Sequence, residues 1–465
     1  MTAQLDTYEQ AIEFLYGRIN FERVNADAYS SSDFKLDRMR LLLERIGNPQ
    51  DRIPVVHVAG TKGKGSTCSM LAGVLTHAGY RTGLYTSPHL IRYEERFTVD
   101  GRQPSPADVV TLVNRIRPYL TEMDRLPPRL HPTYFEITTA LAWLHFKACG
   151  VDVAVLEVGL GGRLDSTNLC RPVVTVITNI SRDHTQFLGS TVREIATEKA
   201  GIIKDGVPVI SGVRHPDAIA AISAIAADHH APLWLIDRDV HYERLESPSN
   251  ESRWEMTVGD VSLPVTVGLL GEHQGANAAL AVAATIRMRV AGWAISDAAI
   301  DAGLRTVHWP ARVEEVGTQP SVILDAAHNW ESAKALVQTI TSSSGERRRI
   351  LVFATTRDKD YRGLVRMLLP HFETVIITKY LENPRGVPIE DLENYIVTIA
   401  DRPVHTVTEP YAAWKLARKL AVPADQIVVT GSFFLIAELR ELILDDLRVV
   451  DACTDPSRDR EEASS

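Results

Sequence analysis

The stretch "VVHVAGTKGKGST", residues 55–67, decides the fold because it joins a strand to a helix through a glycine-rich turn. "VVHVAG" predicts a buried strand, and "STCSMLAGVL" predicts a helix that begins with a hydroxyl residue. The glycines between them allow backbone N–H groups to converge on an anion at the helix N-terminus. The stretch therefore predicts a phosphate-binding loop, with Lys64 against the β- and γ-phosphates and Ser66 near phosphate or Mg²⁺.

The sequence of this loop differs from the common G-x-x-x-x-G-K-[ST] pattern. Two residues instead of four separate Gly60 from Gly63, and Gly65 stands between Lys64 and Ser66. A glycine-rich turn without a ligand is the alternative interpretation. Lysines at 62 and 64 and the strand–loop–helix context favour the phosphate site.

Length and composition indicate a globular protein of two domains. The chain has 465 residues, 45% hydrophobic and 23% charged, with a net charge of −9. This charge argues against nonspecific binding to nucleic acid or to an anionic membrane. The four cysteines form no C-x-x-C motif, and no apolar run is long enough for a membrane span. The N-terminus predicts an amphipathic helix and no signal peptide, so we expect a cytoplasmic protein.

Strands and helices alternate along most of the chain. "VDVAVLEVG", "PVVTVITNI" and "VPVISGV" predict further strands, with helices over about 66–78 and 191–203. Such alternation is typical of a parallel sheet covered on both faces. Residues 237–267 predict short antiparallel strands instead. Alternation restarts after "HWPARVEEV", a plausible linker, with "SVILDAAHN", "RRILVFATT", "ETVIITKY" and "DQIVVTGSFF".

These patterns predict an α/β protein with three parts. A large P-loop-type domain with a mostly parallel sheet spans residues 1–303. A smaller, Rossmann-like α/β domain spans residues 304–448. Residues 449–465 are polar and are expected to form a disordered tail.

Polar residues follow several predicted strands. Glu157 ends a strand in "LEVGLGGRLDSTN", and a carboxylate at that edge of a parallel sheet suits a metal–phosphate site. Asp183-His184 follows the next strand, although Mg²⁺ prefers oxygen to imidazole. Each residue could equally be a structural side chain, and both interpretations stay open at this point.

Further candidates are weaker when each is considered alone. Ser87 offers an oxygen ligand after a short strand, and Lys199 follows a helical segment. Surface positions or helix capping would explain them as well. The polar residues expected around a cleft between the domains are Asn277, Arg312, Asp325 and His328.

Taken together and in order, the motifs resemble those of the folylpolyglutamate synthases. This group includes the bifunctional dihydrofolate synthases and belongs to the Mur ligase superfamily. The motifs are "GTKGKGS", "YTSPHL", "TYFEITTALA", "LEVGLGGRLDSTN", "ISRDHTQFLG", "EKAGIIK", "GEHQGANA", "WPARVE", "LDAAHN" and "VVTGSFFLIAE". The resemblance spans about residues 35–440. The G-K-G-S sequence of the loop is similar to that of the folate branch, whereas the loop of the cell-wall Mur ligases looks more like G-K-T-T.

The resemblance implies roles for residues at matching positions. Lys64, His184 and Lys199 match catalytic residues, and Lys199 matches a lysine that is carbamylated. Two Mg²⁺ ions are implied, with ligands matching Ser87, Glu157 and His184. The positions that match ATP contacts are Gly63, Lys64, Gly65, Ser66, Asn277, Arg312, Asp325 and His328. The positions that match pterin contacts are Phe34, Lys35, Leu36, Thr133, Tyr134, Phe135, Glu136, Leu164, Asp165 and Ser166.

Three departures from the family pattern stand out. Lys62 occupies a position where the family often has Asn, which makes this loop more basic. Ala311 replaces the common Gly of W-P-G-R, and "LDAAHNW" replaces a frequent L-D-G-A-H-N-P. None of them removes a group that the resemblance assigns to the chemistry.

The implied activity is ATP-driven ligation of L-glutamate to folates, and also to dihydropteroate, through an acyl phosphate. ATP is expected between the domains, in a monomer without nucleic-acid or membrane partners. The catalytic base stays unassigned. Two alternatives are a Mur-type ligase acting on cell-wall precursors and a nucleotide-binding module without activity. Only about 50 residues precede the loop, which disfavours a separate N-terminal nucleotide-sugar domain.

Overall fold

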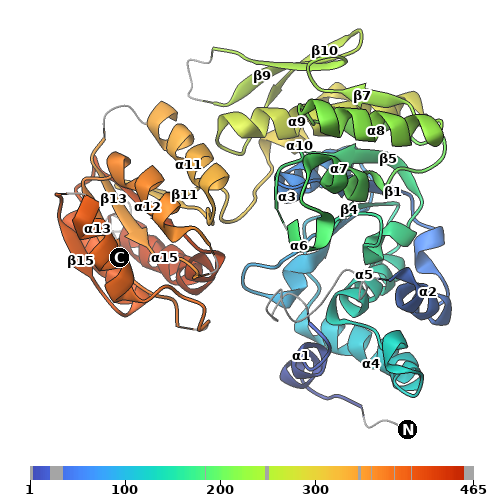
Figure 1. Ribbon diagram of the computed structural model, residues 1–465, viewed down its shortest axis with the longest axis horizontal. Coiled ribbons are helices and arrows are strands. Elements are labelled where there is room, and N and C mark those ends of the chain that lie inside the picture. Colours follow the sequence, from blue (N-terminus) through green and yellow to red (C-terminus); the bar gives the residue numbers. More distant parts are fainter. Residues whose placement is uncertain are drawn as a thin grey trace, which may run out of the picture. The chain divides into compact units, whose positions relative to one another are not determined.

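The computed structural model divides the chain into two compact units (Figure 1). Unit 1 consists of Met1–Gly268 and Gln274–His308, and unit 2 of Leu269–His273 and Trp309–Ser465. The boundary predicted at 303/304 would cut helix α10 (Asp297–Arg305), whereas the chain leaves unit 1 after His308. The structure describes residues 4–20, 35–183, 185–246, 251–343, 347–357, 359–381, 383–399 and 401–454.

Unit 1 is built around a seven-stranded sheet in the order β3-β2-β4-β1-β5-β6-β7. Only β3 runs antiparallel to its neighbour, so the predicted mostly parallel sheet is confirmed. Every residue of β1 and β4 is buried, as expected for central strands covered on both faces. The strands are β1 (Val55–Ala59), β2 (Thr82–Tyr85), β3 (Phe97–Val99), β4 (Val153–Glu157), β5 (Pro172–Ile177), β6 (Val209–Ser211) and β7 (Leu233–Leu235).

The helices of unit 1 include both of the segments predicted at 66–78 and 191–203. The helix after the glycine-rich loop is α3 (Lys64–His77), and the second is α7 (Val192–Ala200). The others are α1 (Tyr8–Tyr16), α2 (Leu36–Arg45), α4 (Pro106–Met123), α5 (Tyr134–Cys149), α6 (Thr185–Leu188), α8 (Pro216–Asp228), α9 (Glu272–Val290) and α10. Short 3₁₀ helices are η3 (Pro49–Asp51), η4 (Tyr93–Arg96), η5 (Pro128–Leu130) and η6 (Ser166–Leu169).

The predicted N-terminal amphipathic helix is α1. Thr7 and Gln10 form a capping box at its start, which satisfies backbone N–H groups that a helix leaves unpaired. Its buried residues, Ala11 and Leu15, join one apolar core with residues of α2, α4 and α5. This core supports the end of α5 at which the predicted "TYFE" segment lies.

The antiparallel strands predicted between residues 237 and 267 are also present. They form a three-stranded sheet in the order β10-β9-β8. β9 and β10 are joined by the two-residue turn Gly259-Asp260, where Gly259 has φ 57°. The strands are β8 (Val240–Arg244), β9 (Arg253–Val258) and β10 (Val261–Thr266).

Unit 2 has a six-stranded sheet in the order β11-β12-β16-β13-β14-β15. Only β11 runs antiparallel to its neighbour, so the second α/β unit is confirmed as well. The strands are β11 (Glu314–Thr318), β12 (Ser321–Leu324), β13 (Arg349–Phe353), β14 (Thr374–Ile377), β15 (Val404–Thr406) and β16 (Gln426–Thr430). The helices are α11 (Trp330–Ser343), α12 (Tyr361–Leu368), η7 (Leu369–His371), α13 (Ile389–Ile399), α14 (Pro410–Leu420) and α15 (Phe433–Thr454).

The C-terminal helix corrects one expectation. Residues 449–454 were predicted to begin a disordered tail, yet they continue α15. The helix follows because "DLRVVDACT" contains no glycine or proline to end it, and the first proline comes at position 456. Polar composition alone does not prevent a helix from extending by further turns.

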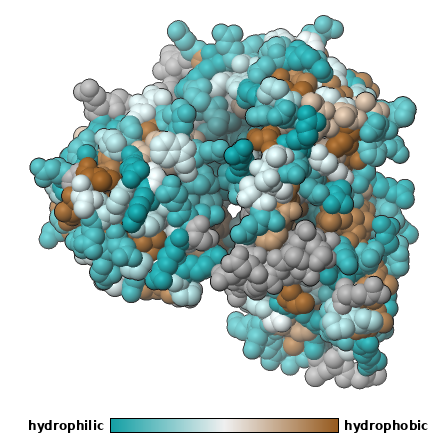
Figure 2. Space-filling model, in the orientation of Figure 1, coloured by the Kyte–Doolittle hydropathy of each residue, from teal (hydrophilic) through white to brown (hydrophobic). Residues whose placement is uncertain are grey.

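No helix within the described residues is long and apolar enough to cross a membrane. The face visible in Figure 2 is mostly hydrophilic, with apolar residues in scattered positions. Both observations agree with a composition of 45% hydrophobic and 23% charged residues.

Two glycines let α3 and α10 approach closely. A Cβ atom at Gly73 would lie 2.8 Å from the carbonyl oxygen of Gly303, and one at Gly303 would lie 2.4 Å from Cα of Val74. Because these neighbours are backbone atoms, they cannot move aside as a flexible side chain would. The helix that begins at the phosphate loop is thus held at backbone contact distance from α10.

We expect Gly303→Ala to lower the free energy of unfolding by about 1–3 kcal/mol, because the added methyl overpacks this contact. Urea unfolding followed by tryptophan fluorescence would measure the change. Gly17→Ala is the control, since Gly17 has φ −70° at the end of α1 and its nearest neighbour would be 3.3 Å away. An equal loss in the two variants would contradict the close-packing argument.

Candidate active site

The glycine-rich loop connects β1 to α3 as predicted. Gly60 (φ 151°) and Gly63 (φ 79°) adopt backbone conformations that other residues rarely reach. A Cβ at Gly60 would lie 1.8 Å from Oγ1 of Thr178, so a side chain is excluded there. Gly63 caps α3 without a side-chain hydrogen bond, which leaves the first N–H groups of the helix for an anion.

Two lysines converge on the carbonyl oxygen of Gly60. Lys64 Nζ donates to it over 3.2 Å, and Lys199 Nζ donates to it over 2.9 Å. Lys64 Nζ also lies 3.9 Å from Oε1 of Glu157, at the end of β4. The structure therefore brings together three residues that the sequence assigned to the chemistry, from three separate segments.

Lys199 has an unusual environment for an amine. It is buried near the C-terminal end of α7. Burial, and after it the charge of Lys64, lower the pKa of Lys199 to about 7. A substantial fraction of this lysine is therefore a neutral amine near physiological pH, which is the form that can act as a nucleophile.

Ser87 and Glu157, two of the predicted metal ligands, are neighbours. The backbone N–H of Ser87 donates to Oε2 of Glu157 over 3.3 Å. The third predicted ligand, His184, lies outside the described residues. Within the part of the chain that is described, no three His, Cys, Asp or Glu side chains gather as a metal site. Ser87 and Glu157 are thus two predicted ligands that the described part of the chain brings together.

The loop after β5 is tied to the phosphate loop. Lys62 Nζ lies 3.0 Å from Oδ2 of Asp183, and the Lys62 N–H donates to Oδ1 of Asn179 over 2.8 Å. Thr178 Oγ1 donates to the Lys62 carbonyl over 2.6 Å. The Lys62 side chain that departs from the family pattern therefore pairs with the residue preceding His184.

Asn277 lies against the same loop. A Cβ at Gly63 would come within 2.4 Å of its Oδ1, and its Nδ2 donates to Oε1 of Gln274 over 2.9 Å. Position 277 was predicted as an ATP contact, and the side chain is next to the start of α3. Gly65 and Ser66 belong to the first turn of that helix.

The "TYFE" segment begins α5, and most of its polar groups have structural partners. Thr133 and Glu136 form a capping box, and Arg38 Nε donates to Oε1 of Glu136 over 3.0 Å. Burial raises the pKa of Glu136, while Arg38 opposes this shift. Tyr134 is buried, and the ring of Phe135 lies 6.1 Å from that of Tyr85. Phe135 is therefore the predicted pterin contact of this segment with the most exposed ring.

The remaining predicted pterin contacts divide into two groups. Asp165 caps η6 and also accepts the N–H of Leu160 over 2.9 Å, while Ser166 Oγ lies 2.8 Å from Oγ1 of Thr139. Leu164 is half-buried. Lys35 and Leu36 are at the start of α2, and Phe34 lies outside the described residues.

In unit 2, Asp325 is held by the backbone. The N–H groups of Val313 and Ala327 donate to its two oxygens, each over 2.8 Å. Burial raises the pKa of Asp325 to about 6, although the neighbouring Arg312 opposes the shift. His328 is half-buried, with Nδ1 2.9 Å from the carbonyl oxygen of Ala326. Arg312 precedes β11, and Asp325 and His328 follow β12, so the three residues predicted in this unit as ATP contacts flank the β11–β12 pair.

The backbone around Arg312 is strained. Ala311 has φ 59° and Val313 has φ 48°, the left-handed region that a β-branched residue rarely enters. This explains why glycine suits the position of Ala311 in the W-P-G-R pattern. The strained turn directs the Val313 N–H to Asp325.

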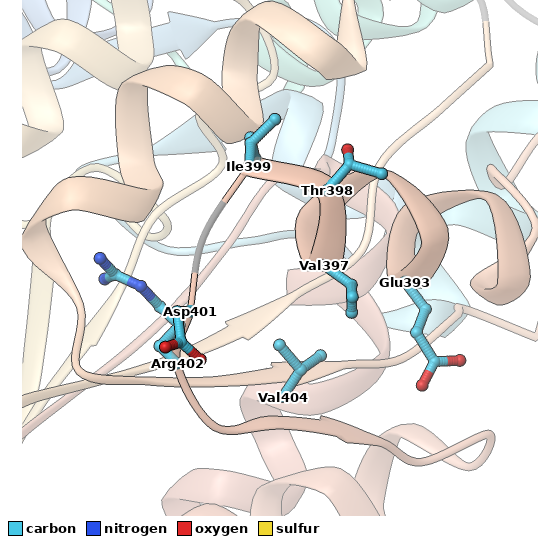
Figure 3. A pocket seen from close by; sticks show the side chains of 7 residues that line it. All are labelled: Glu393, Val397, Thr398, Ile399, Asp401, Arg402 and Val404. Carbon is cyan, nitrogen blue, oxygen red and sulfur yellow. The ribbon is translucent and has the colours of Figure 1, made fainter.

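A pocket of about 710 Å³ lies elsewhere in unit 2, at the C-terminal end of α13 (Figure 3). Val397, Ile399 and Arg402 are among the side chains that line it. None of the residues predicted from the sequence lines this pocket. The site is therefore defined by its loops and charged groups, and not by the volume of this pocket.

Two residues near the site were not predicted from the sequence. Arg38 pairs with Glu136, and His57 is a buried imidazole in β1. His57 could have been singled out because it is the one polar residue in an otherwise apolar strand. Arg38 gave no comparable signal, because an arginine near a helix start is ordinary.

Comparison with known families gives the class of protein first. A Mur ligase middle domain matches residues 58–285, and a Mur ligase glutamate ligase domain matches residues 311–433. The two matches follow each other along the chain and lie largely in unit 1 and in unit 2, respectively.

Individual relatives indicate which branch of the Mur ligases this chain is similar to. The dihydrofolate synthase/folylpolyglutamate synthase of Bacillus subtilis is 35% identical over 437 residues, which cover 93% of this chain and 98% of that protein. The crystal structure of Thermotoga maritima folylpolyglutamate synthase has a TM-score of 0.82 at 31% identity, covering 94% of this chain and 96% of that chain. Escherichia coli FolC, solved with DHPP and ADP, has a TM-score of 0.81 at 31% identity and covers 96% and 100%.

The chain belongs to the folylpolyglutamate synthase/dihydrofolate synthase family of Mur ligases. The resemblance noted in the sequence is thereby confirmed, and with it the interpretation as a C–N bond-forming ligase.

The environment of Asp325 predicts a pH-dependent stability of unit 2. Its carboxyl binds a proton more tightly in the folded state, where the pKa is about 6, than in the unfolded chain, where the ordinary pKa is 3.8. Stability from this group is therefore complete below pH 3.8 and is lost as the pH rises through 6. The loss approaches about 3 kcal/mol at neutral pH.

The variant Asp325→Asn cannot ionise, so it should lack this loss between pH 4 and 7. Urea unfolding of both proteins at several pH values would show the difference, with Asp401→Asn at an exposed position as control. Parallel pH profiles for the wild type and Asp325→Asn would contradict the assignment.

Proposed function

We propose that this protein joins the amine of L-glutamate to the carboxylate of a folate, driven by ATP, and that it also accepts dihydropteroate. The observation that supports this most is the convergence of Lys64 and Lys199 on Gly60, next to Glu157 and the N-terminus of α3. A lysine ammonium group such as that of Lys64 and the first N–H groups of a helix are groups that bind phosphates. Family membership and the relative solved with ADP and DHPP point to ATP and a pterin as the ligands.

The reaction proceeds in two steps. The acceptor carboxylate attacks the γ-phosphorus of ATP, the bond to the β-phosphate oxygen breaks, and ADP and an acyl phosphate result. The neutral amine of glutamate then attacks the acyl carbon, phosphate leaves with its electron pair, and the nitrogen loses a proton. Activation is necessary because a carboxylate oxygen is a poor leaving group. Lys64 and the loop N–H groups stabilise the charge on the transferring phosphoryl group.

Magnesium would be held by Ser87 and Glu157, with His184 as the third ligand carried over from the family. The two described residues fit, because both offer oxygen atoms and they lie next to each other at the phosphate loop. Bound Mg²⁺ supplies positive charge that neutralises the phosphate oxygens.

We further propose that Lys199 is carbamylated. Its neutral amine would add to CO₂ with formation of an N–C bond and release of a proton, giving an anionic carbamate. The low pKa and the burial of Lys199 support this chemistry. An anion at this position would lie next to Lys64 and could help to hold a second metal ion.

The other assignments are proposals taken from the family. Asn277, Arg312, Asp325 and His328 would contact ATP. Phe135 would stack on the pterin, with the rest of 133–136, Leu164, Asp165, Ser166 and residues 34–36 around it. A Mur-type ligase of cell-wall synthesis is the second candidate, favoured by the shared domains alone.

The assay that tests this function measures glutamate-dependent phosphate release from Mg-ATP with tetrahydrofolate, dihydropteroate or a UDP-muramoyl precursor. We expect turnover with the first two. Turnover only with the UDP-muramoyl acceptor would overturn the proposal in favour of the cell-wall branch. Lys64→Ala should be inactive with every acceptor while its circular dichroism and melting temperature stay unchanged, and near wild-type activity in this variant would contradict the role of the loop.

Carbamylation predicts that Lys199→Ala loses most of its activity and regains part of it when acetate or formate is added, because a small carboxylate can replace the carbamate. Initial rates with and without the acid measure this rescue. Lys64→Ala is the matched control, since a carboxylate cannot replace a missing cation. Equal activity of Lys199→Ala with and without acid would contradict carbamylation.

A further inference from the structure

A buried imidazole lies in the strand that leads to the phosphate loop. His57 is fully buried in β1, whose other residues are Val and Ala. Its Nε2 lies 2.9 Å from Oγ1 of Thr167, and its Nδ1 lies 3.5 Å from Sγ of Cys170. A buried polar ring is costly unless it is hydrogen-bonded, and both nitrogens have a partner here. The reaction described above does not use it.

The protonation states of this cluster are set by burial. Burial, and then the charge of Lys204, lower the pKa of His57 to about 3, so the ring is neutral. One ring nitrogen is then a donor and the other an acceptor. Burial raises the pKa of Cys170 to about 12, so its sulfur keeps the proton.

The hydrogen bonds of Thr167 determine which nitrogen of His57 is the donor. Thr167 Oγ1 donates to Oδ1 of Asp165 over 2.5 Å, and that carboxylate also accepts the N–H groups of Thr167 and Leu160. Burial raises the pKa of Asp165, and these hydrogen bonds oppose the shift; each of its two oxygens accepts an N–H group, so the carboxylate acts here as an acceptor. Since the hydroxyl has a single hydrogen, its oxygen must accept from His57 Nε2–H. In this series of hydrogen bonds each group therefore donates to the next, from Cys170 through His57 and Thr167 to Asp165.

Asp165 in turn closes the glycine-rich loop 159–165. It caps η6 at the end of the loop and accepts Leu160 N–H at the beginning. A Cβ at Gly159 would lie 2.4 Å from Cζ of Phe135, and one at Gly162 would lie 2.8 Å from the carbonyl oxygen of Lys199. The loop thus contacts both the aromatic ring proposed for the pterin and the helix that positions Lys199.

We propose that His57 is a positioning residue for the folate acceptor, an inference that rests on the proposed function. Through Thr167 it orients the side chain of Asp165, which keeps loop 159–165 closed and packed against Phe135. Without the Nε2–H donor, the Thr167 hydroxyl is left with one unpaired lone pair in a buried place and no fixed orientation. The acceptor site loosens as a result, while Lys64 and the start of α3 are unaffected.

The test compares His57→Met, Thr167→Val and the double variant in the glutamate-dependent assay. We expect KM for tetrahydrofolate to rise about tenfold in each single variant, while KM for ATP changes by less than about twofold. The double variant should be no worse than the worse single, because both changes break the same chain. His57→Gln keeps an N–H near the position of Nε2 and should restore KM to within about twofold of the wild type.

Thr175→Val is the matched control. Thr175 pairs in register with His57 on the neighbouring strand β5, is equally buried, and its hydroxyl has no hydrogen-bond partner in the described part of the chain. The same loss of a hydroxyl should leave both KM values unchanged. A rise in the KM for ATP that matches the rise for folate would indicate general damage and overturn the proposal.

Hydrogen exchange of the peptide covering residues 158–166 gives a readout that needs no folate. The Leu160 amide should exchange faster in His57→Met and Thr167→Val than in the wild type, His57→Gln or Thr175→Val. Unchanged exchange, or equal behaviour of the Met and Gln variants, would overturn the inference. If the wild type itself shows no turnover with folates, the proposed function fails, and the exchange data still decide the role of His57.

Discussion

The carbonyl oxygen of Gly60 is the point on which the site depends. It accepts hydrogen bonds from Lys64, at the start of α3, and from Lys199, in the last turn of α7. Gly60 adopts a backbone conformation, with φ 151°, that other residues rarely reach. Burial, and after it the charge of Lys64, lower the pKa of Lys199. The geometry of the loop and the low pKa of Lys199 thus belong to one local arrangement.

Much of the fold could be predicted from the sequence, for a physical reason. Central parallel strands such as β1 and β4 are buried on both faces and appear as short apolar runs, and glycines mark the turns that follow them. The domain boundary and the end of α15 were harder to predict from the sequence. Both depend on where a helix stops: α10 runs to Arg305, past the predicted boundary at 303/304, and α15 runs to Thr454, into residues whose polar composition suggested a tail.

The candidate site could be predicted where a residue type is unusual for its position. Glu157 ends a buried strand, and Lys64 belongs to a glycine-rich strand–loop–helix motif, so both could be singled out as candidates. Glu136 and Asp165 were harder, because the same carboxylates form a capping box and a loop closure that no local pattern distinguishes from ligand binding. The partner Arg38 is 98 residues from Glu136 in sequence. Such pairings are properties of the folded chain alone.

Unit 2 is assembled from two separate segments of the chain. Leu269–His273 belongs to unit 2, and Leu270 packs against its core, although 274–308 returns to unit 1. During synthesis, unit 2 therefore receives its first apolar side chain before unit 1 is complete. A fragment that starts at Trp309 would lack Leu270 and expose the patch it covers. The two units are consequently separate in structure but interleaved in sequence, and neither can be cut out as one continuous segment.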